Sequence, residues 1–104
     1  MQTKVKIPKV IKMGTLDYKI LFDPYIWKEE GKRAQVNYLK LLIKVDNQIP
    51  NGLRGISLLH EIVHVIDEIY SLDLDDNDTD RLAHGLADFL FNNLKIELDW
   101  SSIT

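Results

Sequence analysis

The segment Leu58–Asp67, LLHEIVHVID, places two histidines and a glutamate inside an otherwise apolar stretch. Around it, apolar residues recur at a spacing of three or four: Ile56, Leu59, Val63, Ile66 and Tyr70. This periodicity predicts a helix over about residues 53–70. Because His60 and His64 are four residues apart, both imidazoles should project from one face of that helix.

His60, Glu61 and His64 form an H-E-x-x-H motif. Two imidazoles at this spacing can reach one tetrahedral Zn²⁺ ion at about 2.0–2.1 Å. Glu61 is turned about 100° from His60 and lies beside the metal, where it can take a proton from a zinc-activated water. Two other interpretations are open: hydrogen-bonded histidines on a half-buried face, and a zinc site without catalysis.

A catalytic zinc site needs a third protein ligand and an open position for water. A second helix is predicted over about residues 78–94. Its predicted buried face holds Leu82, Leu86, Phe89 and Leu90. Asp78 falls on the N-terminal edge of that face, where the helix dipole favours a carboxylate, so Asp78 is the predicted third ligand. The alternative is that Asp78 only caps the helix, and the fallback ligand positions are Asp75, Asp76 and Asn77.

Other polar residues have weaker assignments. Asp67 follows His60 by seven residues and falls on the metal-facing side, where it either orients a histidine or lies in solvent. His84 is predicted to face outward from the second helix as a surface residue. The sequence assigns no second donor for an oxyanion; the candidates are Tyr25, Tyr70 and His84.

The first half of the chain has the pattern of β-strands. Lysines alternate loosely with branched apolar residues over 4–7 and 9–12, and the pattern resumes over 16–22 after a break at Gly14, which predicts a hairpin. Residues 34–46 are apolar and β-rich, as one bent strand or two short ones.

The remaining segments complete the predicted fold. Residues 25–33 read as a loop or a short helical turn, and residues 47–55 have loop chemistry. The tail through Trp100 is expected to be loose or to pack back on the body. The fold class is therefore α+β: a small N-terminal antiparallel or mixed β-sheet followed by two helices, as one domain over residues 1–104.

Composition limits the classes of protein that the sequence can represent. The chain has 104 residues, no cysteine and no apolar run of about 18 residues, so we expect no disulfide, no thiolate metal site and no membrane span. The N-terminal residues lack the features of a signal peptide, and a cytoplasmic location is the expectation. Any metal must be held by His, Asp or Glu.

Charge is unevenly distributed along the chain. Residues 1–44 carry ten Lys or Arg and four Asp or Glu, for a net charge of +6, whereas residues 45–104 carry three and twelve, for a net charge of −9. One interpretation is a basic surface for an anionic partner. The other is that the two halves neutralise each other across one fold.

Two segments together resemble a known family. LLHEIVHVID, followed by DTDRLAHGLADFL at residues 78–90, resembles the ImmA/IrrE-type zinc metallopeptidases, especially their short phage and prophage members. The second motif of that family resembles E-A-N-x-F-A and falls on residues 78–83, so the resemblance also places the acidic ligand at Asp78. This chain has Asp, Thr and Asp at positions 78, 79 and 80, where Glu, Ala and Asn are usual.

The resemblance implies a minimal zincin-like domain that acts as an intracellular zinc endopeptidase. His60, His64 and Asp78 would hold Zn²⁺, and Glu61 would be the general base. Some members of the family act on repressors of mobile elements, so the expected partner is a protein or peptide substrate such as a repressor. A strand within residues 39–45 would bind it at the sheet edge by β-augmentation.

Two alternatives to a peptidase come from other classes of protein. The first is a non-catalytic zincin-fold module that works by protein contact, with a regulatory role in a phage or mobile element. The second is a nucleic-acid binder that uses the lysine-rich half. The absence of a helix-turn-helix pattern and of a basic stripe among aromatic residues disfavours the second.

Overall fold

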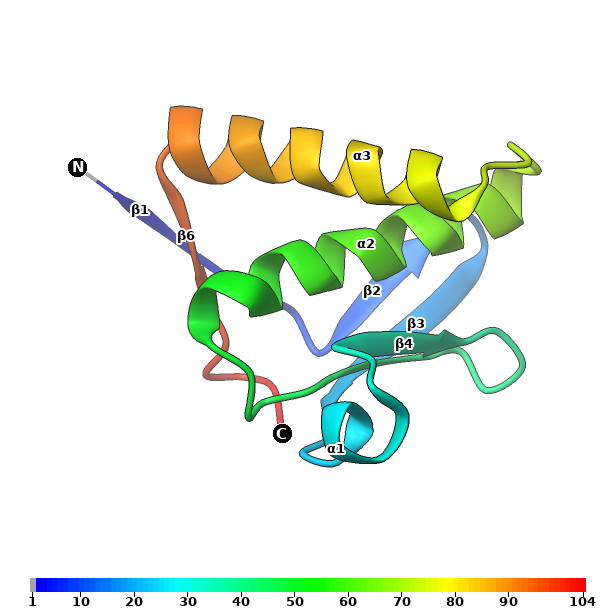
Figure 1. Cartoon of the computed structure of the whole chain (residues 1–104), viewed down its shortest axis with the longest axis horizontal. Coiled ribbons are helices and arrows are strands. Elements are labelled where there is room, and N and C mark those ends of the chain that lie inside the picture. The colour runs from blue at the N-terminus through cyan, green and yellow to red at the C-terminus, as the bar shows by residue number, and fades with distance from the viewer. Residues whose placement is uncertain (1) are drawn as a thin grey trace.

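A computed structural model describes residues 2–104 and confirms the α+β class (Figure 1). Five of the six strands within residues 2–104 lie in the first half of the chain, and the two long helices follow them. In chain order the elements are β1 (Thr3–Lys6), β2 (Val10–Met13), β3 (Leu16–Phe22), α1 (Ile26–Glu30), β4 (Ala34–Asn37), β5 (Leu42–Val45), α2 (Asn51–Tyr70), α3 (Asp76–Ala87), the π-helical turn η1 (Asp88–Asn93) and β6 (Ile96–Asp99).

The main sheet has four strands in the order β2-β3-β5-β4. β2 and β3 form the predicted antiparallel hairpin, β3 and β5 are parallel, and β4 and β5 are antiparallel. Residues 34–46 therefore form two short strands. β5 pairs on both sides, so the prediction that a strand within residues 39–45 forms the sheet edge is wrong, and β4 is the edge strand. Ile43 and Val45 of β5 are fully buried, as is typical of an interior strand.

The C-terminal tail packs back on the body. β6 pairs in parallel with β1 to form a separate two-stranded sheet. Beyond β6, the ring of Trp100 stacks on that of Phe22 with 5.6 Å between the ring centroids. This contact joins the tail to the main sheet.

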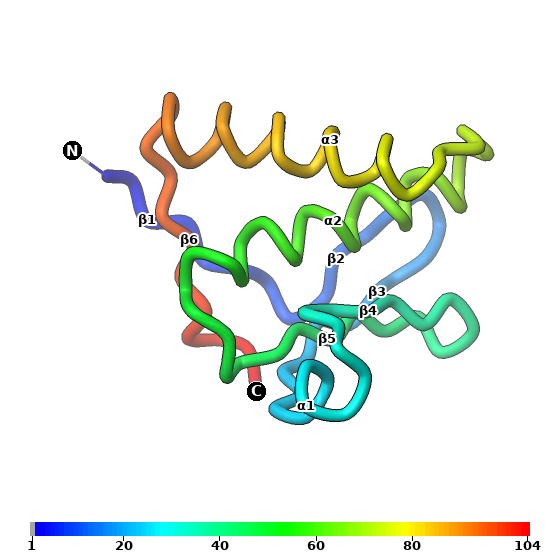
Figure 2. Tube along the Cα trace, viewed as in Figure 1, coloured from blue at the N-terminus to red at the C-terminus, as the bar shows by residue number. Residues whose placement is uncertain are grey.

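Helix α2 lies between the main sheet and α3, and Figure 2 shows the two helices running side by side in opposite directions. On the sheet side, α2 contributes Leu58 and Val65 to a core that includes Tyr18, Ile20 and Ile43. No helix within residues 2–104 has both the length and the apolar composition needed to cross a lipid bilayer.

Helix α3 buries a different face from the one that its large apolar residues predicted. Leu82 is 47% exposed and Leu86 is 40% exposed, whereas the buried residues of α3 are Thr79, Ala83 and Ala87. The predicted face is wrong because α3 packs on another helix, where a strip of small side chains lets the two backbones approach closely. The predicted continuous helix also ends earlier, and the π-helical turn η1 after Ala87 changes the register of Phe89 and Leu90.

The two oppositely charged halves meet where α2 packs on the main sheet and along the pair of β1 and β6. Lys4 is in register with Glu97, and Lys6 with Asp99. Among residues 2–104, Lys44 forms an ion pair with Asp23 and the ring of His60 lies 3.3 Å from Asp80, and each of these contacts lies within one half of the chain. The halves are thus adjacent at this pair of strands without direct ion pairs between them.

Candidate metal and catalytic site

Helix α2 brings the two histidine rings of the motif together. The Nε2 atoms of His60 and His64 are 3.1 Å apart, and the ring centroids are 4.8 Å apart in an edge-on arrangement. Two nitrogen ligands at 2.0–2.1 Å from one tetrahedral ion would be about 3.3 Å apart. The separation fits two ligands of one metal ion, and it is equally the distance of a hydrogen bond between the two rings, so both interpretations of the motif stay open.

The protonation state of His64 also suits a metal ligand. Burial lowers the pKa of His64 from its ordinary value of 6.5, and the neighbouring His60 lowers it further, while Asp76 and Asp67 oppose the change. The ring is therefore neutral at neutral pH, which is the form of imidazole that binds a metal.

Glu61 is a buried carboxylate on the pocket side of α2. The residue is only 6% exposed, and its Oε2 atom is buried without a hydrogen-bond partner among residues 2–104. Burial raises the pKa of Glu61 to about 7, and the charge of Lys32 partly opposes that rise. An unpaired carboxylate oxygen destabilises a fold, so its presence beside two convergent histidines favours a functional interpretation over a structural one.

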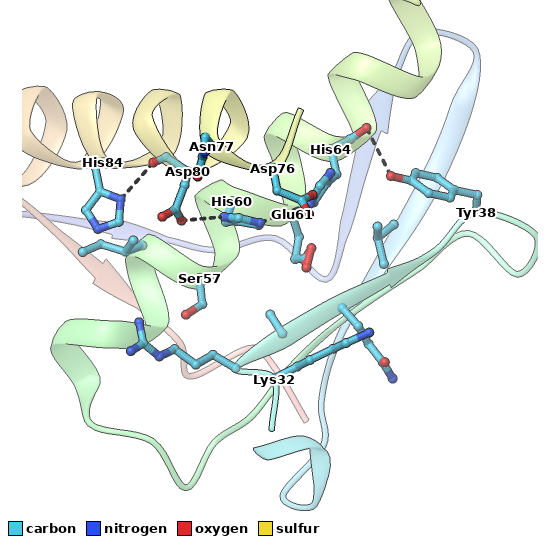
Figure 3. A pocket seen from close by; sticks show the side chains of 15 residues that line it. Lys32, Tyr38, Ser57, His60, Glu61, His64, Asp76, Asn77, Asp80 and His84 are labelled. Atoms are coloured by element: carbon cyan, nitrogen blue, oxygen red, sulfur yellow. Dashed lines mark hydrogen bonds and ion pairs between the residues drawn. The ribbon is translucent and has the colours of Figure 1, made fainter. Parts of the chain in front are cut away.

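Asp80, rather than Asp67, is the carboxylate that lies close enough to orient a histidine of the motif. The Oδ1 atom of Asp80 lies 3.3 Å from Nδ1 of His60 (Figure 3). A histidine that donates from Nδ1 to a carboxylate keeps Nε2 free to bind a metal. Asp67 instead accepts a hydrogen bond from the backbone N–H of Leu74 at 3.3 Å, in the connection between α2 and α3.

The structure places Asp78 at the N-terminal cap of α3. Its backbone N–H donates to Asp75 Oδ1 at 2.7 Å, and its own carboxylate accepts from the backbone N–H of Asp75, which together form a capping box. Asp78 does not line the pocket that contains the histidines, whereas Asp76, one of the fallback positions, does. The structure therefore does not bring the predicted third ligand to His60 and His64.

The corrected face of α3 explains this difference. With buried Ala83 as the reference and about 100° per residue, Asp76 lies at about 20° and Asp80 at about 60°, facing α2. Asp78 lies about 140° away from Ala83, half-buried in the N-terminal cap of α3. Asp78 is on the buried side of α3 only if the exposed leucines Leu82 and Leu86 are taken as the buried face.

The ligand set is incomplete in this conformation. Among residues 2–104, no three side chains of His, Asp or Glu are grouped closely enough to hold one ion. His60 and His64 provide two convergent nitrogens, and Figure 3 shows Asp76 beside His64 on the same side of the pocket. Asp76 is therefore the candidate for a third ligand that the pocket lining offers at the first turn of α3.

A pocket of about 630 Å³ opens in front of this cluster, between α2, α3 and β4. On the β4 side it is lined by Ala34, Gln35, Val36 and Tyr38. The hydroxyl group of Tyr38 donates to the backbone carbonyl of His64 at 3.3 Å, and burial raises its pKa to about 12, so Tyr38 keeps its proton near the site. No local signal in the sequence identified Tyr38.

His84 is exposed, as predicted, but it lines the pocket rather than facing away from it. Its Nδ1 atom lies 2.8 Å from the backbone carbonyl oxygen of Asp80. His84 and Ile56 also line a second cavity of about 430 Å³, which lies next to the first on the side of η1 and β6. The other two candidate oxyanion donors, Tyr25 and Tyr70, are 58% and 62% exposed and line neither cavity.

The free edge of β4 also borders the pocket. Because the backbone N–H of Asp46 donates to the carbonyl of Arg33, alternation along the antiparallel ladder leaves the backbone groups of Ala34 and Val36 directed to the unpaired edge. The pocket therefore combines a pair of convergent imidazoles, a buried carboxylate and an open strand edge.

Comparison with known proteins adds no identification, because no family model, curated protein or solved structure matches this chain. The resemblance to ImmA/IrrE-type metallopeptidases stays a prediction that depends on the H-E-x-x-H motif.

Proposed function

We propose that this protein is a zinc-dependent metallopeptidase that hydrolyses peptide bonds in the groove between α2, α3 and β4. One observation carries the proposal: His60 and His64 present their Nε2 atoms to one point, 3.1 Å apart, next to a buried carboxylate with an unpaired oxygen. A pocket large enough for a peptide segment lies in front of them.

In this proposal His60, His64 and Asp76 would hold the zinc ion. When bound, zinc would polarise the scissile carbonyl group and lower the pKa of water. Asp76 replaces Asp78 as the third ligand because Asp76 lines the pocket while Asp78 belongs to the helix cap. Asp80 holds the ring of His60 through Nδ1, which keeps the tautomer that a metal requires.

Glu61 is the general base of the proposed reaction. It takes a proton from the attacking water and delivers it to the leaving amine. In the metal-free protein the pKa of Glu61 is about 7, and a bound divalent cation would lower it, which favours the ionised form that accepts the proton. Tyr38 keeps its proton at neutral pH, and its single O–H, which donates to the carbonyl of His64, would have to turn away from that carbonyl to donate to a developing oxyanion.

The substrate is a protein or peptide segment in extended form, with a repressor as one expected example. The backbone groups of Ala34 and Val36 on the free edge of β4 provide the hydrogen bonds for an added strand. The second cavity, which adjoins the first at Ile56 and His84, could take residues beyond the bond that is cleaved.

A second candidate function is a non-catalytic protein-interaction module. The observation that favours it is the incomplete ligand set, since among residues 2–104 no three metal-binding side chains are grouped. Such a module would bind a partner strand at β4 without cleaving it.

Substitution of Glu61 by Gln separates the two functions. Zinc-loaded wild-type protein is incubated with a proteome-derived peptide library, and new termini are identified by mass spectrometry. Under the peptidase proposal, Glu61→Gln keeps zinc and loses cleavage by at least about a hundredfold. The matched control is Glu68→Gln on the exposed side of α2, which should cleave like the wild type. Cleavage by the Glu61→Gln variant at the wild-type rate would contradict the proposal.

A further inference from the structure

Lys32 and Arg33, immediately before β4, line the pocket of the proposed site. Both are exposed, and within residues 2–104 no carboxylate lies within 4.0 Å of either, because the ion pairs there join Lys44 to Asp23 and His60 to Asp80. Figure 3 shows Lys32 across the hollow from Glu61. The wall that continues the free edge of β4 therefore carries two cationic side chains without an ion-pair partner.

The acidic residues of the same pocket already have partners in the proposed mechanism. Asp80 pairs with His60, and Asp76 would bind the metal. With a divalent cation bound, the three carboxylates of Glu61, Asp76 and Asp80 are outweighed by the metal together with Lys32 and Arg33. Without a metal the same five side chains sum to a formal charge of −1, so the positive charge that favours an anionic group of the substrate is that of Lys32 and Arg33 themselves.

We propose that Lys32 and Arg33 form a subsite for an acidic side chain, so that the groove selects peptides with Asp or Glu close to the scissile bond. That a scissile bond lies next to this subsite rests on the proposed peptidase function. An arginine guanidinium binds a carboxylate through two parallel hydrogen bonds, and a lysine adds a point charge. Recognition of an acidic residue thus uses the chemistry of both side chains.

The position of the subsite relative to β4 predicts the side on which the acidic residue falls. A substrate strand that pairs antiparallel with β4 runs opposite to the direction from Ala34 to Asn37. Its C-terminal side then extends toward Lys32 and Arg33. Antiparallel pairing is the slightly more stable arrangement per residue, so the acidic residue is expected on the C-terminal side of the cleaved bond.

The test compares cleavage preferences of charge-reversal variants. Wild-type protein, the double variant Lys32→Glu/Arg33→Glu and the control Lys40→Glu/Lys28→Glu digest the same proteome-derived library. The control changes the net charge equally at exposed residues that line neither cavity. We expect Asp and Glu to be enriched about fivefold within three residues C-terminal to the wild-type cuts, as for one exposed ion pair. The double variant should lose this enrichment and favour Lys or Arg, whereas the control should resemble the wild type.

Measurements of peptide binding test the subsite even if no library peptide is cleaved. Fluorescent octapeptide pools with blocked termini, randomised except for a central Glu or Gln, are titrated against zinc-loaded Glu61→Gln protein by anisotropy. The Glu pool should bind about fivefold more tightly, and the added Lys32→Glu and Arg33→Glu changes should abolish that difference. Equal binding of both pools, or an acidic preference that persists after charge reversal, would overturn the subsite. Cleavage without any acidic preference would also overturn it while leaving the peptidase proposal intact.

Discussion

Helices α2 and α3 lie side by side, yet α2 buries large branched side chains and α3 buries small ones. On its sheet side α2 buries branched residues such as Leu58 and Val65, whereas α3 buries Thr79, Ala83 and Ala87 and leaves Leu82 in solvent. A helix on a sheet must fill volume, but two helices that approach closely need small residues at the contact. The face of α3 in turn decides which acidic residues reach the histidines of α2.

The largest expected effect distinguishes two acidic residues at the start of α3. Asp76→Ala should lower zinc affinity by about a hundredfold or more, because it removes the proposed third ligand from the pocket. Asp78→Ala should leave zinc affinity unchanged and instead cost about 1 kcal/mol of stability through the lost capping box. Competition with a zinc-binding dye measures affinity, and urea denaturation measures stability. The reverse pattern would restore Asp78 as the ligand.

Glu61 on α2 should destabilise the metal-free protein at neutral and alkaline pH. Its pKa rises from 4.5 to about 7 in the fold, so stability present below pH 4.5 is lost as the pH rises toward about 7. Glu61→Gln should therefore raise the free energy of unfolding by about 3 kcal/mol at pH 8, with a much smaller difference at pH 4. Urea denaturation in the presence of a chelator at both pH values measures this. If Glu61→Gln is no more stable than the wild type at pH 8, the ionised carboxylate of Glu61 does not destabilise the fold.

The packing difference between the two helices can be tested with size changes on α3. Ala83→Leu should destabilise the protein by about 2 kcal/mol, because Ala83 is fully buried against α2 and a larger side chain overpacks the contact. Leu82→Ala, at an exposed position next to it, should change stability by less than about 0.5 kcal/mol. Thermal and urea unfolding of both variants provide the comparison. A larger loss from Leu82→Ala would show that the leucine face is buried after all.

The smallest effect concerns the carboxylate that orients His60. Asp80→Asn should weaken zinc binding about tenfold, because the amide keeps the shape but loses the charge that accepts from Nδ1 of His60. The matched variant Asp67→Asn should leave zinc binding unchanged, since Asp67 contacts the backbone of Leu74. Equal losses in both variants would contradict the assignment of Asp80.

The sequence predicted the features that depend on local periodicity. The helix that carries His60, Glu61 and His64, the hairpin of β2 and β3, and the α+β class all follow from short-range patterns, and the structure confirms them. The convergence of the two imidazoles also follows, because a spacing of four residues fixes it within a single helix.

The parts that could not be predicted depend on contacts between elements. The choice among Asp76, Asp78 and Asp80 requires knowledge of which face of α3 meets α2, and large apolar residues indicated the wrong face. The placement of Tyr38 and Lys32 at the pocket depends on strand order, which places β4 rather than β5 at the sheet edge. No periodicity within one segment contains that information.

Zinc stoichiometry tests the central claim most directly, that two imidazoles on α2 share one metal ion. Purified protein is stripped with a chelator, incubated with zinc, desalted and measured by inductively coupled plasma mass spectrometry, beside His60→Ala, His64→Ala and the exposed control His84→Ala. The account predicts one zinc per chain in the wild type and in His84→Ala, and almost none in the other two variants. A wild type that retains no zinc, or full retention after His64→Ala, would contradict it.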